Sequence, residues 1–133
     1  MCGFAGLWIP SAPTEQLLEA QAIAMAAALS HRGPDDAGVW CEPQLGLALG
    51  HRRLAILDRS AAGHQPMHSA PGRYVIAFNG EIYNHRDLRR ELEACGAAPP
   101  WRGHSDTETL LAAIEAWGLE PALQRCSGMF VLA

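Results

Sequence analysis

The chain opens with MCGFAGLWI, residues 1–9, an apolar run that has a cysteine at its second position. The run is closed by Pro10 and predicts a first β-strand. If Met1 is removed, Cys2 carries a free α-amine and a thiol on adjacent carbons. An α-amine titrates close to neutral pH and can take up the thiol proton, which is how N-terminal nucleophiles act. The alternative is that Cys2 is a small buried hydrophobic side chain of the strand.

The composition is that of one globular domain and excludes several classes of function. The 133 residues are 49% hydrophobic, and no run is long enough to span a bilayer. The start lacks the basic region and long apolar core of a secretory signal, so we expect a cytoplasmic protein with no membrane partner. A net charge of -4 argues against a broad nucleic-acid-binding face. All ten basic residues are arginines, which excludes chemistry that needs a lysine and leaves arginine to bind a carboxylate.

The cysteines and histidines do not form a recognisable metal motif. The four cysteines contain no CxxC pair, and in a reducing cytosol we expect free thiols. The six histidines contain no HExxH motif, so each is expected to be a turn or cap residue. We therefore predict no metal site.

The remaining patterns predict alternating strands and helices, and hence a layered α+β domain. Residues 14–30 form a helix whose buried side is expected to hold Leu17, Leu18, Met25 and Leu29. Residues 45–58 are expected to be two short strands or one bent strand. The segment GMFVLA, residues 128–133, is typical of the start or middle of a buried strand. Because the chain stops there without a turn, we expect a fragment of a longer protein.

Two further helices are predicted from their capping signals. Asn84 should cap a helix over residues 85–95, which ends before Gly96. Ser105 and Glu108 have the spacing of a capping box at the start of a second helix. The apolar stripe of that second helix is Leu110, Leu111, Ile114 and Trp117.

Three short segments contain candidate catalytic or binding residues. Each of these residues also has a purely structural explanation. In HRRLAILD, residues 51–58, the adjacent Arg52 and Arg53 face opposite ways on a strand, so only one can point into a site. The alternative is an amphipathic strand with exposed arginines. Asp106, in the segment HSDTE, is favoured in a first helical turn by the helix dipole, or it projects towards a substrate amine.

The third segment is FNGEIYN, residues 78–84, in which Asn79-Gly80 lies between two β-rich runs. This dipeptide predicts a hairpin turn. In addition, the Gly80 N–H and the Asn79 carboxamide could serve as two donors of an oxyanion hole. Glu81 could accept a hydrogen bond from a substrate ammonium.

The order and content of seven segments together are specific. MCGFAG, HRGPDDAG, HRRLAILD, QPM, FNGEIYN, HSDTE and GMF follow one another along the chain. This closely resembles the class II glutamine amidotransferase domain at the start of asparagine synthetase-like enzymes, over essentially all of residues 1–133. The resemblance implies an N-terminal nucleophile hydrolase fold, a four-layer αββα sandwich with two antiparallel sheets, here truncated at its C-terminal end.

The resemblance also implies roles for individual residues. Cys2 is implied as the nucleophile, Asn79 and Gly80 as the oxyanion donors, and Arg53 rather than Arg52 as the clamp for the glutamine carboxylate. The residues implied to complete the glutamine pocket are Leu54, Ile56 and Leu57, through their backbone, and Glu81 and Asp106, which hold the α-amino group.

The implied reaction is hydrolysis of the glutamine side-chain amide through a thioester on Cys2. Ammonia then passes to a synthetase domain that makes asparagine from aspartate. No cofactor is expected in residues 1–133, since ATP and magnesium belong to the absent synthetase domain. The expected partners are glutamine and that synthetase domain, and a homodimer stays open. Two alternatives remain: an inactive or truncated module with a binding role, and an amidotransferase that serves a different acceptor.

Overall fold

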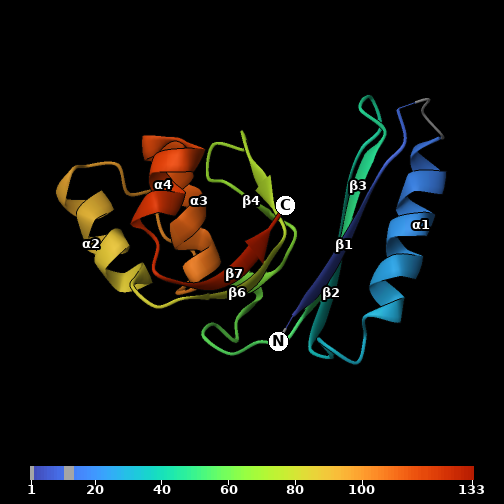
Figure 1. Ribbon diagram of the computed structural model, residues 1–133, viewed down its shortest axis with the longest axis horizontal. Helices are drawn as coiled ribbons and strands as arrows, with labels where there is room; N and C mark the ends of the chain where they lie inside the picture. Colours follow the sequence, from blue (N-terminus) through green and yellow to red (C-terminus); the bar gives the residue numbers. More distant parts are fainter. Residues whose placement is uncertain (1, 11–13) are drawn as a thin grey trace.

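The computed structural model describes residues 2–10 and 14–133 of the chain. This part has four α-helices and antiparallel sheets, which confirms the predicted α+β class. Figure 1 shows two groups of strands side by side, with helix α1 outside the first group and the other helices outside the second. We call these two groups the α1 half and the α3 half.

The α1 half is a three-stranded antiparallel sheet in the order β1-β3-β2 with helix α1, Glu15–Ala28, along one face (Figure 1). The strands are β1, Gly3–Trp8, β2, Asp36–Glu42, and β3, Leu47–Arg53. The register pairs Gly3 with Arg52, so the start of β1 lies beside the end of β3. This pairing brings the beginning of the chain next to the segment that follows Arg53.

The α3 half contains two strand pairs, three helices and a 3₁₀ turn. The pairs are β4, Met67–His68, with β5, Val75–Ile76, and β6, Phe78–Ile82, with β7, Gly128–Leu132. The helices are α2, His85–Ala94, α3, Asp106–Trp117, and α4, Leu119–Arg125, and the 3₁₀ turn spans Ala61–Gly63.

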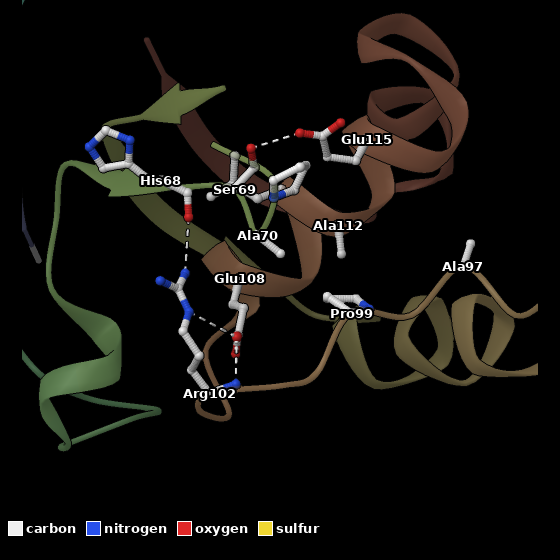
Figure 2. A pocket seen from close by; sticks show the side chains of 11 residues that line it. His68, Ser69, Ala70, Ala97, Pro99, Arg102, Glu108, Ala112 and Glu115 are labelled. Carbon is white, nitrogen blue, oxygen red and sulfur yellow. Dashed lines mark hydrogen bonds and ion pairs between the residues drawn. The ribbon is translucent and has the colours of Figure 1, made fainter. Parts of the chain in front are cut away.

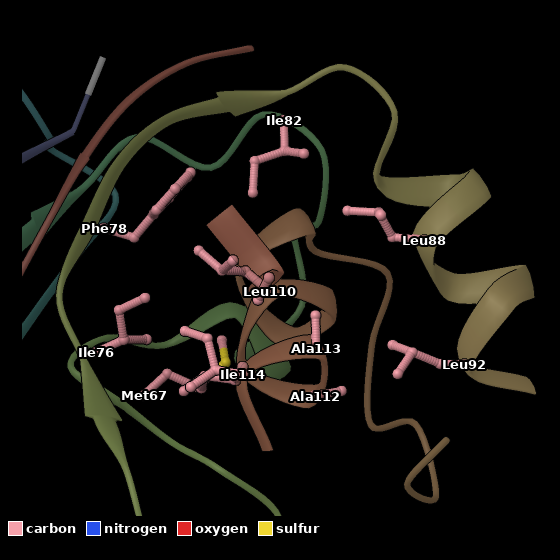
Figure 3. Packing of buried hydrophobic residues seen from close by; sticks show 12 residues of the cluster. Met67, Ile76, Phe78, Ile82, Leu88, Leu92, Leu110, Ala112, Ala113 and Ile114 are labelled. Atoms are coloured by element: carbon pink, nitrogen blue, oxygen red, sulfur yellow. The ribbon is translucent and has the colours of Figure 1, made fainter. Parts of the chain in front are cut away.

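Helix α3 lies at the centre of the larger hydrophobic core. Figure 3 shows Leu110, Ala113 and Ile114 of this helix among side chains from the neighbouring elements. Phe78 and Ile82 come from β6, and Leu88 and Leu92 from α2. Strand β6, which contains Asn79 and Gly80, is therefore packed directly against α3.

The packing of α1 differs from the prediction. Of the four expected residues only Leu18 is fully buried, Met25 and Leu29 are partly buried, and Leu17 is exposed. The buried stripe is instead Leu18, Ala22 and Ala26. The helix lies so close to the sheet that a Cβ on Gly50 of β3 would be 2.6 Å from the Ala22 carbonyl oxygen. Small residues are needed at that distance, which explains the difference.

Other local predictions also need correction. Strand β2 was not among the strands expected from the sequence. The Asn84 side chain does not cap α2, because it donates to the Arg125 carbonyl and accepts from the Ser127 N–H, both at 2.8 Å. Strand β7 is formed as predicted but is covered on one side only, since Met129 and Val131 are exposed.

Candidate active site

A cavity of about 440 Å³ lies where the α1 half meets the α3 half. Every residue that the sequence singled out for catalysis or substrate binding lines it. These residues are Cys2, Arg53, Leu54, Ile56, Leu57, Asn79, Gly80, Glu81 and Asp106. Residues far apart in the sequence thus line a single pocket, and the α1 half supplies the thiol of Cys2 and the guanidinium of Arg53.

Cys2 lies immediately before β1 and is half-buried. Its Sγ accepts a hydrogen bond from the Leu54 N–H at 3.3 Å and lies 3.6 Å from the Leu54 carbonyl oxygen. The Arg32 Nε donates to the Cys2 carbonyl at 3.1 Å. Both backbone groups of Leu54 therefore contact the sulfur and hold the thiol at the cavity wall.

Arg53 ends β3 and is 7% exposed. Its Nη1 donates to the Ser60 carbonyl at 2.9 Å and its Nη2 donates to the Asp58 carbonyl. Arg52 projects elsewhere and donates from Nε to the Gly33 carbonyl at 2.9 Å. Arg53 has five N–H donors in total, so three stay available to a carboxylate in the cavity.

Asn79 and Gly80 do not form the predicted hairpin turn. Both lie inside β6, paired with Val131 and Phe130 of a strand from the far end of the chain. The hairpin prediction was wrong because β6 finds its partner in β7, so the chain does not reverse at this point. Gly80 has φ 153°, and a Cβ there would overlap the β7 backbone.

This strand geometry directs the Gly80 N–H away from β7. In an antiparallel pair, alternate residues turn their N–H groups outward. On either side of Gly80, the Phe78 N–H donates to Gln65 Oε1 at 2.7 Å and the Ile82 N–H donates to Asp106 Oδ2 at 3.0 Å. By the same alternation we expect the Gly80 N–H to point away from β7, and Gly80 lines the cavity. Asn79 also lines the cavity, and its Oδ1 is buried without a hydrogen-bond partner among the described residues.

Asp106 is the first residue of α3 and is 5% exposed. Its Oδ2 accepts from the Ile82 N–H and its Oδ1 from the Thr107 N–H at 2.9 Å. Desolvation raises the pKa of this carboxyl, and the two hydrogen bonds offset that rise only in part. Ser105 caps the same helix by accepting the Glu108 N–H at 3.1 Å, which is one half of the predicted capping box.

The rim of the cavity is apolar and exposed. Ile56 is 68% exposed and Leu57 is 43% exposed, and both follow Arg53 on the same segment. Glu81 is also exposed at the cavity wall. Arg53 and Asp106 are therefore buried in the pocket, whereas Ile56, Leu57 and Glu81 lie at its exposed edge.

Sequence reasoning missed several polar residues that line the cavity, among them Asp58 and Gln65. Gln65 accepts the Phe78 N–H and donates from Nε2 to Thr107 Oγ1 at 3.4 Å, so it joins β6 to α3. Asp58 joins two loops through its carboxylate. Both residues fall within segments quoted for the resemblance, but their contacts depend on the fold and have no sequence signal of their own.

A second, smaller cavity of about 210 Å³ lies beside α3 (Figure 2). Several of its polar side chains are paired with one another or with backbone. Ser69 Oγ donates to Glu115 at 2.7 Å, Arg102 Nη2 donates to the His68 carbonyl at 3.0 Å, and Arg102 Nε lies 3.6 Å from Glu108.

Residues 2–10 and 14–133 lack two other kinds of feature. They contain no cluster of three or more histidine, cysteine, aspartate or glutamate side chains that could hold a metal ion. None of the helices described is long and apolar enough to cross a membrane.

Comparison with known proteins identifies the class of this site. The family model for the glutamine amidotransferase domain matches residues 1–133, and the chain belongs to that family. It is 42% identical to a putative glutamine-hydrolysing asparagine synthetase of Mycobacterium tuberculosis, over all of this chain and 22% of the relative. It is 39% identical to asparagine synthetase 3 of Bacillus subtilis and 35% identical to asparagine synthetase B of Escherichia coli. All of this chain is covered in both, but only 21% and 23% of those relatives.

Proposed function

We propose that this chain is the glutamine-hydrolysing domain of an asparagine synthetase-like enzyme. The observation that carries the proposal is the single cavity that holds the Cys2 thiol, the Arg53 guanidinium, the Gly80 N–H and the Asp106 carboxylate. These groups match the four parts of glutamine hydrolysis: a nucleophile, a carboxylate clamp, an oxyanion donor and an acceptor for an ammonium.

In this proposal Cys2 attacks the side-chain amide carbon of glutamine. With Met1 removed, the free α-amine of Cys2 takes the thiol proton and later gives it to the departing ammonia. The oxyanion is stabilised by the Gly80 N–H and the Asn79 carboxamide. The γ-glutamyl thioester is then hydrolysed by water, which releases glutamate and restores the thiol. The Leu54 N–H, at 3.3 Å from Sγ, helps to hold the sulfur in place.

The α-amino acid end of glutamine is bound by the charged groups of the pocket. Arg53 is fixed by two backbone carbonyls and offers its remaining donors to the α-carboxylate. Asp106 and Glu81 accept from the α-ammonium. The backbone of Leu54, Ile56 and Leu57 forms the wall between them.

We further propose that residues 1–133 are an amidotransferase domain with the four-layer N-terminal nucleophile hydrolase fold. The order of α1, sheet, β6–β7 pair and α3 in Figure 1 supports this assignment. The chain spans about a fifth of the length of the relatives it matches. This supports a synthetase part that receives the ammonia and makes asparagine from aspartate with ATP and magnesium.

The test is a glutaminase assay on the full-length protein that contains this chain. Cys2→Ala should lower the rate of glutamate release by about 10⁴-fold or more, because the nucleophile and its thioester are lost. Cys95→Ala removes an exposed thiol of α2's C-terminal end and is the matched control, with wild-type activity expected. Glutamine hydrolysis that persists in Cys2→Ala, or is absent from the wild-type protein, contradicts the proposal.

A further inference from the structure

Asp58 is a buried carboxylate that the proposed chemistry does not use. It is 7% exposed and lies on the segment between β3 and the 3₁₀ turn. One oxygen, Oδ1, accepts from the Ser60 N–H at 2.8 Å and from the Ser60 hydroxyl at 2.6 Å. The other oxygen, Oδ2, accepts from the His104 N–H at 2.7 Å. The carboxylate therefore connects two segments that are 46 residues apart.

One of these segments holds the guanidinium of Arg53. The two carbonyls that accept from Arg53 belong to Asp58 and Ser60. The same two residues are locked to one another by the Asp58 carboxylate. The direction of those carbonyls, and hence of the guanidinium, depends on this local turn.

The other segment leads into Asp106. Three successive backbone N–H groups there donate to carboxylates: Arg102 and Gly103 donate to Glu108 at 2.7 and 3.0 Å, and His104 donates to Asp58. Glu108 belongs to α3 itself, whereas Asp58 belongs to the segment after β3. Asp58 thus fixes the start of α3 relative to Arg53.

Gly103 makes this contact possible. A Cβ at position 103 would overlap Asp58 Oδ2 and would lie 2.8 Å from the Ala62 Cβ. Any larger residue would push the carboxylate away from the His104 N–H. Gly103 does not have a positive φ, so alanine is compatible with its backbone and the obstacle is the contact alone.

The electrostatics support a carboxylate that stays ionised. Desolvation raises the pKa of Asp58, but the hydrogen bonds from Ser60 and His104 and the charge of Arg53 outweigh it and leave the pKa lowered. An ionised carboxylate can accept on both oxygens at once.

We propose that Asp58 is a positioning residue for substrate recognition, which holds the Arg53 clamp and the Asp106 acceptor at the separation that an α-amino acid head group requires, and that Gly103 provides the space for it. This inference rests on the proposed function, because it concerns the same pocket. It assigns specificity for the α-carboxylate and α-ammonium to a side chain that touches neither group.

The first test is Asp58→Asn in the full-length protein. An amide has a single acceptor oxygen, so it can serve Ser60 or His104 but not both. The KM for glutamine should rise by about tenfold while kcat stays within about twofold, because head-group binding is lost and the nucleophile is unchanged. Asp87→Asn removes an exposed carboxylate of α2 and is the matched control, with no change expected.

Two alkylating probes separate positioning from loss of structure. Iodoacetamide has no amino acid head group and should label Cys2 at the wild-type rate in Asp58→Asn. A γ-chloroketone analogue of glutamine, from which the thiolate displaces chloride, should label Cys2 about tenfold more slowly. If both rates fall together, or if neither falls, Asp58 does not position the head group.

Gly103→Ala tests the same contact without changing the carboxylate. It should reproduce the higher KM and the slower reaction with the chloroketone, and most of its effect should disappear in an Asp58→Ala background. A normal KM in Gly103→Ala overturns the inference even if Asp58→Asn fails to fold. A wild-type protein that does not hydrolyse glutamine contradicts the proposed function instead, so the two failures are distinguishable.

Discussion

Helices α1 and α3 both lie against strands, but they differ in how much of their surface the fold covers. In α3 every residue from Asp106 to Ile114 is buried, and the surrounding core cluster has twelve buried members. In α1 only Leu18, Ala22 and Ala26 are buried, and the corresponding cluster has three. The α3 half is therefore the better packed part of the molecule.

The difference matters because the cavity draws on both halves. The α3 half supplies Asp106 and the proposed oxyanion donors, and the thinly packed α1 half supplies Cys2 and Arg53. The two halves are joined by buried hydrogen bonds, among them the one from His51 Nε2 of β3 to the Phe78 carbonyl of β6 at 3.1 Å. We infer that the α3 half is the fixed frame against which the nucleophile is aligned.

After the loss of the Cys2 thiol, the next largest effect is expected at Asn79, a proposed oxyanion donor of the α3 half. Asn79→Ala should lower kcat for glutamine hydrolysis by about 10²–10³-fold with little change in KM, because the donor acts on charge that develops in the transition state. Steady-state kinetics of the full-length protein measure this. Gln124→Ala, which removes an exposed carboxamide from α4, should behave as wild type. A raised KM with unchanged kcat for Asn79→Ala would instead place its contribution in ground-state binding.

The packing difference between the two halves is tested by two matched leucine-to-alanine substitutions, each of which creates a cavity. Leu110 in α3 and Leu18 in α1 are both 0% exposed. Leucine-to-alanine changes in cores cost about 2–5 kcal/mol, with the larger values where the surroundings cannot collapse. We expect Leu110→Ala at the upper end and Leu18→Ala at the lower end. Amide hydrogen exchange within each helix gives the free energy of opening, and equal losses would remove the distinction between the halves.

A smaller effect is expected from pH. Because desolvation raises the pKa of Asp106, its carboxylate is protonated at a higher pH than an ordinary aspartate. As the pH falls through that raised pKa, the ammonium of glutamine loses its acceptor and kcat/KM falls. Asp106→Asn should abolish this acid limb.

His85, whose pKa is lowered chiefly by burial, also interacts with Asp106. His85→Gln should keep the acid limb if Asp106 is its source. A limb that disappears in His85→Gln and persists in Asp106→Asn would assign it to the histidine.

Local sequence patterns predicted most of the helices and strands. The family resemblance predicted which residues lie together in the pocket. The strand at residues 3–8 and the helices α1, α2 and α3 follow from apolar spacing and breakers that act within one element. The hairpin at Asn79-Gly80 was wrong, because strand pairing across 50 residues outweighed the local turn preference. The buried face of α1 was also wrong, since it depends on how closely the helix approaches Gly50.

The candidate site shows the same contrast between what local sequence patterns predict and what depends on contacts between distant segments. All residues proposed for the pocket lie in one cavity, although no periodicity in the sequence places Cys2 beside Leu54 or Asp106 beside Ile82. Asp58 and Gln65 could not be predicted, because their importance lies in backbone N–H groups contributed by distant segments.

The most direct test of the central claim is to locate the reactive thiol in the full-length protein. After reaction with one equivalent of the γ-chloroketone analogue of glutamine, the N-terminal peptide is analysed by mass spectrometry. We predict a peptide that begins at Cys2, lacks Met1 and carries the thioether adduct, with Cys41, Cys95 and Cys126 unmodified. An adduct on one of those three cysteines, or a Cys2 still preceded by Met1 in active protein, would contradict the account.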